Sequence, residues 1–280
     1  MYRCIVLAWG LVFASLPAVM AQDKVVPFAV NISSTVNMDA DGKKQVIDAK
    51  TALAYRWTNK GTERTLSYDS TQVNVQIDAK STLDMVMSRE KVIVGSGDQK
   101  KETLFKDCPE NQQKMLQDSF AVPLCKLQVD ANRLETKRDV VAGEGAKVMI
   151  DNGMIANAVL FHAPFFADKP EWEADREISM GNSGFAKGKL TYKRVAGKEP
   201  PTVTVTGKLA NAKHKLPTGP ISIVDANYDV TGEQTFDPAV GEWTAGKLAI
   251  EMSFEIVNEA KKIGSAKGTM TQTLEYKPQP

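Results

Sequence analysis

The sequence predicts a mainly β protein of the α+β class, with a curved antiparallel sheet or half-barrel and two short helices on its concave face. Two observations predict this fold. Apolar and polar residues alternate with a period of two over several stretches, and turn-forming residues separate these stretches. Such alternation is typical of antiparallel strands that bury one face against a core and leave the other face in water.

The first 21 residues have the pattern of a secretory signal peptide. Arg3 precedes an uncharged, mostly apolar run that ends at Pro17, and Ala21 completes a cleavage motif of small residues. The run is shorter than the ~20 apolar residues that span a bilayer. We therefore expect an exported, soluble protein in the periplasm or outside the cell. Gln22 stands where a lipoprotein has its cysteine, so we expect no lipid anchor.

The charges of the chain balance, with 35 Lys and Arg against 34 Asp and Glu, and Arg3 leaves with the signal peptide. A nucleic-acid-binding protein normally has a basic excess, so this class of function is not expected. The length fits one β-rich domain over residues 22–280, or two closely packed halves, 22–150 and 151–280.

Residues 26–97 are expected to form four or five strands. Apolar side chains alternate with polar ones over residues 73–77, and the same parity resumes over residues 83–87. Asp-Gly at 41–42 and Lys-Gly at 60–61 are suited to chain reversals between strands.

One of these turns partly matches an oxygen-rich calcium loop, because Asn37, Asp39 and Asp41 precede Gly42 at alternate positions. Two lysines follow in the loop, and the flanking residues alternate as strands do. We therefore expect an ordinary Asp-Gly hairpin. No metal site and no cofactor are predicted.

A short helix is expected after residue 107. Asp107 is suited to cap the helix, Pro109 to occupy its first turn, and Glu110 to be the glutamate of a capping box, three residues after the cap. Apolar residues at positions 115, 116 and 120 can then share one helix face.

Two cysteines, Cys108 and Cys125, follow the signal peptide. An even pair in an exported chain predicts a disulfide, which would contribute roughly 3 kcal/mol in the chain-entropy model. Two buried thiols or a redox pair are the alternatives, although the Cys-x-x-Cys spacing of redox pairs is absent.

A second helix is expected from residue 151 or 152 to about His162, and it ends before Pro164. This segment is apolar on most sides and too short to span a membrane. Packed on the concave face of the sheet, it would border an apolar cleft. The predicted ligand-binding residues are Met154, Ile155, Val159, Phe161, Phe165, Phe166, Trp172 and Met252. Filling of an ordinary core is the alternative role for the same side chains.

Four acidic residues alternate with other residues over positions 171–178, so on a strand they share one face: Glu171, Glu173, Asp175 and Glu177. We expect a solvated sheet edge that resists strand-to-strand aggregation. A bound cation or a basic partner is the alternative. Residues 187–276 follow as a meander of about five strands.

No catalytic residue is predicted. His162 and His214 are the only histidines, and the chain has neither a G-x-S-x-G motif nor a complete dinucleotide-binding glycine motif. With 34 acidic residues, a pair of catalytic carboxylates cannot be singled out.

Several short motifs, taken in their order, resemble a family of secreted bacterial proteins catalogued as a domain of unknown function. The matching pieces are Leu53-x-Tyr55-x-Trp57-x-x-x-Gly61, Leu83-Asp84-Met85-x-Met87, Pro164 through Pro170 to Trp172, Phe236-Asp237-Pro238 with Gly241, and Gly268-Thr269 to Tyr276. The family usually has a glycine before the tryptophan of the third motif, where this chain has Glu171. The resemblance implies an exported β-rich protein and provides no catalytic residue.

The leading hypothesis is a non-enzymatic envelope protein that binds an apolar ligand or lipid in its concave face. The alternative is a structural or assembly module that contacts other periplasmic proteins through its polar strand faces and acidic row. A hydrolase that uses carboxylates is the third hypothesis.

Overall fold

The computed structural model describes residues 24–40, 42–78, 81–151, 153–180, 184–211, 221–258 and 261–278. The predicted signal peptide, residues 1–21, and His214 therefore lie outside the described residues.

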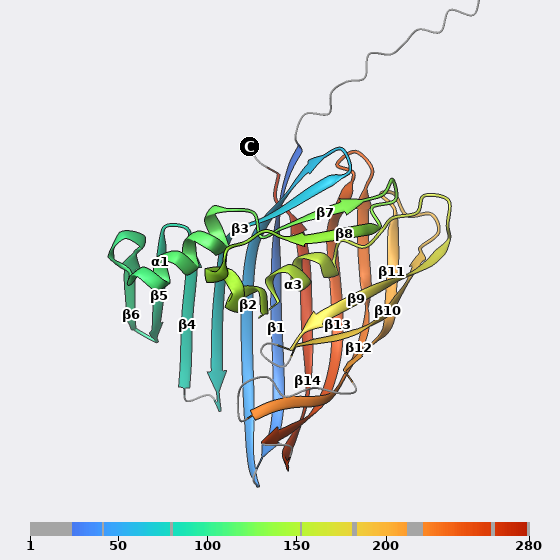
Figure 1. Cartoon of the computed structure of the whole chain (residues 1–280). Helices are drawn as coiled ribbons and strands as arrows, with labels where there is room; N and C mark the ends of the chain where they lie inside the picture. Colours follow the sequence, from blue (N-terminus) through green and yellow to red (C-terminus); the bar gives the residue numbers. More distant parts are fainter. Residues whose placement is uncertain are drawn as a thin grey trace, which may run out of the picture.

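The described residues form one curved antiparallel sheet, which confirms the predicted fold class (Figure 1). The strands of the N-terminal half are β1 (Lys24–Ala40), β2 (Lys43–Lys60), β3 (Glu63–Ile77), β4 (Ser81–Ser88), β5 (Lys91–Ser96), β6 (Gln99–Leu104), β7 (Cys125–Val129) and β8 (Glu135–Val140). Those of the C-terminal half are β9 (Glu171–Ser179), β10 (Phe185–Arg194), β11 (Thr202–Asn211), β12 (Ile221–Asp237), β13 (Glu242–Asn258) and β14 (Lys261–Tyr276).

The first and last strands pair with each other in the middle of the sheet. The order is β6-β5-β4-β3-β2-β1-β14-β13-β12-β11-β10-β9, and β1 and β14 are in register from Phe28 opposite Tyr276 to Ala40 opposite Gly264. This pairing joins the strands of the two halves of the chain into one continuous sheet.

The sheet branches at β3. Residues 63–66 of β3 pair with β7, whereas residues 70–77 pair with β4. One branch continues through β4 to β6, and the other crosses over the sheet as the β7–β8 hairpin (Figure 1). We call the face beneath this hairpin the inner face; it carries Phe28, Tyr55 and Tyr68, which are buried.

The first predicted helix is present as three short pieces: a 3-10 turn η1 (Phe105–Asp107), α1 (Glu110–Leu116) and a π-helical turn η2 (Gln117–Ala121). The predicted cap is wrong. Asp107 ends the preceding turn, and Pro109 occupies the N-cap position with no side-chain hydrogen bond. Proline cannot act as a side-chain cap, so helix packing has to stabilise this start.

The second predicted helix is also present. A 3-10 turn η3 (Glu144–Ala146) and α2 (Lys147–Asp151) lead to α3 (Met154–Leu160), and Gly153 adopts a left-handed φ of 95° between the two helices. The Tyr68 hydroxyl donates a 2.6 Å hydrogen bond to the carbonyl of Met154, which holds α3 against the inner face of β3. No helix in the described residues is long and apolar enough to cross a bilayer.

The predicted disulfide is wrong: Cys108 and Cys125 are both buried free thiols. The Cys108 thiol donates to the carbonyl of Leu104 at 3.3 Å, while Cys125 begins β7 opposite Leu66 of β3. Each cysteine is thus held by contacts of its own. Burial raises the pKa of Cys125 to about 12, so this thiol stays protonated and unreactive at neutral pH.

The predicted hairpin is present, because Ala40 pairs with Lys43 across the β1–β2 turn. The predicted sheet edge is present as well. β9 ends the strand order, and its acidic row lies on the face opposite the buried Trp172.

Candidate functional site

Apolar side chains remain exposed on the inner face of strands β1 to β5, beyond the part of the sheet that the helices cross in Figure 1. Strand alternation places these side chains on the same face as the buried Leu53 and Tyr55. We call this set the open apolar face. Its members are Val36, Ile47, Val73, Val75, Ile77, Leu83, Met85 and Val94.

These residues form one contiguous surface. Ile47 lies directly opposite Ile77, Val75 opposite Leu83, and Met85 opposite both Val73 and Val94. Directly opposed side chains on one face of a sheet are in contact range.

The exposed fractions show that the described part of the chain leaves this surface open. Ile77 is 37% exposed, Leu83 47% and Val94 41%, and the other members are half-buried. Single exposed apolar residues are normal, but a contiguous apolar surface on a water-exposed protein usually marks a binding site.

Most of the predicted ligand-binding residues lie elsewhere, in the packed region around α3. Met154, Ile155, Val159 and Phe161 are all buried there. The ring of Phe161 packs against Gly246 of β13, where a Cβ atom would come within 3.0 Å of it.

The aromatic residues after α3 also pack as a core. Phe165 stacks on Phe236 with ring centroids 4.0 Å apart, and Trp172 stacks on Tyr192 at 5.8 Å. Phe166 meets Trp172 edge to face. These rings therefore pack against one another, with Trp172 buried and Phe165 and Phe166 half-buried.

Met252 is the member of the predicted set that lies apart from α3. It is on the inner face of β13, opposite Gly268 of β14, and Gly268 in turn lies opposite Val36. Met252 is therefore connected across the sheet to the open apolar face. Its own side chain is buried.

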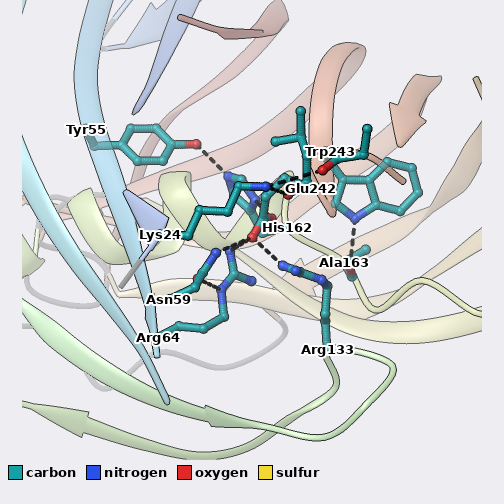
Figure 2. A network of polar contacts seen from close by, with 11 residues as sticks. Lys24, Tyr55, Asn59, Arg64, Arg133, His162, Ala163, Glu242 and Trp243 are labelled. Carbon is teal, nitrogen blue, oxygen red and sulfur yellow. Dashed lines mark hydrogen bonds and ion pairs between the residues drawn. The ribbon is translucent and has the colours of Figure 1, made fainter. Parts of the chain in front are cut away.

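The sequence did not reveal a buried polar network at the other end of the inner face (Figure 2). The carboxylate of Glu242 accepts 3.0 Å hydrogen bonds from Asn59 and Arg64, and it also pairs with Arg133. Arg64 is 3% exposed and Glu242 is fully buried.

This network joins segments that are far apart in the sequence. Asn59 lies near the end of β2, Arg64 is in β3, Arg133 lies in the β7–β8 turn and Glu242 begins β13. Arg64 also lies over the ring of Trp57, 4.5 Å from its centroid. A buried carboxylate with this many donors fixes the β7–β8 hairpin over the sheet.

His162 completes the network from the end of α3. Its Nε2 lies 3.0 Å from the Tyr55 hydroxyl, and its Nδ1 faces Glu242 at 3.5 Å. Burial lowers the pKa of His162 to about 4, in spite of the opposing effect of Glu242. The positive charges of Arg64 and Arg133 make smaller contributions that also lower the pKa of His162.

The pKa of Glu242 stays below its usual range. Burial alone would raise it, but the nearby charges of Arg64 and Arg133 and the contact with His162 outweigh burial. A fully buried carboxylate paired in this way has no access to a substrate, so the geometry favours a structural role over acid–base chemistry.

One sequence signal could have indicated this network. Arg64 has the same parity as Leu66 and Tyr68, so a strand would place its charge on the buried face. A charge at such a position needs a buried partner. The local pattern of residues does not identify that partner as Glu242.

The fold and the site define the class of this molecule as a curved, open antiparallel sheet with an apolar inner face. A comparison with protein-family models and with curated proteins finds no match. The solved structures with a similar fold have low sequence identity to this chain.

A lipovitellin structure, titled for its lipid–protein interactions, is 11% identical with a TM-score of 0.49. The match covers 92% of this chain, but this chain spans only 25% of that one. The β domain of the Bordetella autotransporter BrkA is 9% identical (TM-score 0.25, covering 91% of this chain and 99% of that one). Pseudomonas aeruginosa OpdQ is 7% identical (TM-score 0.22, covering 91% and 100%).

Proposed function

We propose that this protein is an exported, non-enzymatic envelope protein that binds an apolar ligand, such as a lipid acyl chain, on its open apolar face. The observation that carries the proposal is the contiguous exposure of Ile77, Leu83 and Val94 beside half-buried apolar neighbours.

The energetics of the surface support this proposal. Each Å² of apolar surface removed from water contributes about 25 cal/mol, so covering several half-exposed side chains together can hold a ligand of modest size. The surface is built of strands, which keep its shape fixed, and Met85 can adapt to different ligand shapes.

Export is part of the same proposal. It rests on the pattern of the first 21 residues and on the resemblance to a secreted family. A ligand held by apolar contacts also requires no net charge on the protein, in keeping with the balanced composition.

The test is the binding of N-phenyl-1-naphthylamine, an apolar fluorophore, followed by its fluorescence in detergent-free buffer. We expect saturable binding to the unaltered protein. The substitutions Ile77→Glu and Leu83→Glu should each weaken it at least tenfold, because they place a charge where the fluorophore loses its apolar contacts.

Val46→Glu is the matched control. Val46 is 40% exposed, close to Ile77 in exposure, but it lies on the opposite face of β2 from Ile47. It should leave the affinity within about twofold. Equal losses in all three variants, with circular dichroism unchanged, would contradict the proposed site.

A further inference from the structure

The free edges of β8 and β9 face each other on the side of the molecule away from β1. In the described part of the chain, β8 pairs only with β7 and β9 pairs only with β10. The paired strands form a curved series that runs from β8 through β7, β3, β2, β1 and β14 to β9. Its two end strands, β8 and β9, come close to each other. Arg138 of β8 and Glu177 of β9 join the ends by a 2.9 Å ion pair.

A cavity of about 380 Å³ lies at this meeting point, which we call the β8–β9 gap. Leu134, next to β8, and Val159 and Leu160 of α3 give it an apolar wall. Charged residues of both signs form its rim: Glu135, Arg138, Asp175, Arg176, Glu177 and Lys187. The gap is therefore bordered by two strands that pair with no further strand among the described residues, and it has an apolar side facing α3.

The acidic row of β9 has cations on one side. Across the β9–β10 ladder, Lys193 lies opposite Glu171 and Lys189 opposite Asp175, and the Lys189 ammonium pairs with Glu173 at 3.4 Å. On the side of the gap, the ion pairs among the described residues reach only the end of the row, where Arg138 contacts Glu177. A strand added on this side would bring its own side chains directly beside Glu173 and Asp175.

An unsatisfied donor also borders the gap. Arg176 lines the cavity and donates from Nε to the Tyr192 hydroxyl at 3.2 Å, but its Nη2 is buried without a hydrogen-bond partner in the residues described. Buried donors are nearly always paired in native proteins. A backbone carbonyl of an inserted strand would supply the missing acceptor.

We propose that the β8–β9 gap accepts an extended segment of a partner protein as an added strand, and that this segment carries Lys or Arg at alternate positions. Backbone hydrogen bonds to the edge of β9 would provide affinity, and the alternating side chains would provide specificity. Basic residues would lie beside Glu173 and Asp175, and the intervening small or apolar residues would face Val159 and Leu160.

The same acidic row excludes the simplest competitor. If the β9 edge of a second copy entered the gap, its own carboxylates would lie beside Glu173 and Asp175, and like charges directly opposite are unfavourable. The row thus resists self-association while it favours a basic segment. This site is separate from the open apolar face and does not depend on the apolar ligand.

The test uses a dye-labelled seven-residue peptide of alternating Lys and Val, with fluorescence anisotropy as the readout. We expect saturable binding to the full chain and slowed hydrogen exchange at the backbone amides of Glu171–Ser179. The double variant Glu173→Lys/Asp175→Lys should weaken binding at least tenfold.

The matched control is Glu233→Lys/Glu251→Lys, which reverses two exposed carboxylates on the central strands β12 and β13. It should change the affinity no more than about twofold. A second control peptide has the same sequence with N-methyl groups on alternate residues, which remove backbone donors and keep the charge; it should bind at least tenfold more weakly.

Three results would overturn the proposal. They are no saturable binding of the Lys-Val peptide, equal binding of its N-methylated form, and equal loss of binding in the two charge-reversal variants. The second result would mean that charge attraction alone holds the peptide.

Discussion

Glu242 and His162 are the two residues that most directly connect protonation to stability in this molecule. Both are buried, and each has a pKa in the folded protein below its usual value. A buried carboxylate that holds Arg64 and Arg133 is costly to neutralise, because the buried guanidinium of Arg64 and the partly buried one of Arg133 would then lose their counter-charge.

The sign of the pH dependence follows from these directions. The pKa of His162 is about 4 in the folded protein and about 6.5 in an unfolded chain, so the unfolded state binds more protons between these two pH values. The stability is therefore complete above pH ~6.5 and falls as the pH drops towards 4. The lowered pKa of Glu242 causes a further loss at lower pH.

We predict that the free energy of unfolding falls on the order of 3 kcal/mol between pH 6.5 and pH 4. Urea denaturation at several pH values measures it. The variant His162→Gln should lose most of this slope, because the titrating ring is gone, whereas His214→Gln should keep it. A slope that persists in His162→Gln would show that another group causes it.

At the scale of the element, α3 is held by close contact with the sheet. Gly246 lies on the inner face of β13, and a Cβ atom there would approach the Phe161 ring to 3.0 Å and Gln234 to 3.2 Å. A glycine inside a strand often marks such a close approach.

We predict that Gly246→Val lowers the free energy of unfolding by about 1–3 kcal/mol, since the added methyl groups push Phe161 out of its packing. Ala245→Val, the neighbouring exposed position on the opposite face of β13, should change it by less than ~0.5 kcal/mol. Thermal and urea unfolding of both variants provide the comparison. Equal effects would mean that the Phe161 contact does not hold α3.

At the scale of the whole molecule, the pairing of β1 with β14 makes the two halves of the sheet depend on each other. β1 has β2 on one side and β14 on the other, and Glu242 from the C-terminal half holds Arg64 and Arg133 of the N-terminal half.

We predict that residues 24–150, produced alone, do not unfold cooperatively, because β1 loses its partner β14 and Arg64 keeps a buried charge without Glu242. Urea titration followed by tryptophan fluorescence tests this. A sharp transition in this fragment would mean that the N-terminal half is a domain of its own.

The sequence predicted much of this architecture because strand alternation is a local signal. The residue parity over 73–77 and 83–87 placed Val75 and Leu83 on one face, and the structure places them directly opposite each other. The alternating acidic residues of β9 likewise predicted a sheet edge, and β9 ends the strand order.

Long-range contacts could not be predicted in the same way. Local parity can place the charge of Arg64 on the buried face, but its partner Glu242 is 178 positions away. The disulfide prediction met the same limit. It rested on an even number of cysteines in a chain expected to be exported, whereas Cys108 and Cys125 are free thiols with separate contacts. The open apolar face was missed because buried and exposed positions on the inner face use the same residue types.

Photolabelling tests the proposed apolar-ligand site most directly. The full chain would be irradiated with a diazirine-bearing fatty acid, and the labelled residues would be located by mass spectrometry. The account predicts adducts at inner-face positions of the open apolar face, such as Val75, Leu83 and Val94, with competition by unlabelled fatty acid. Adducts spread over the outer face, at Val46 or the intervening polar residues, or no competable labelling, would contradict it.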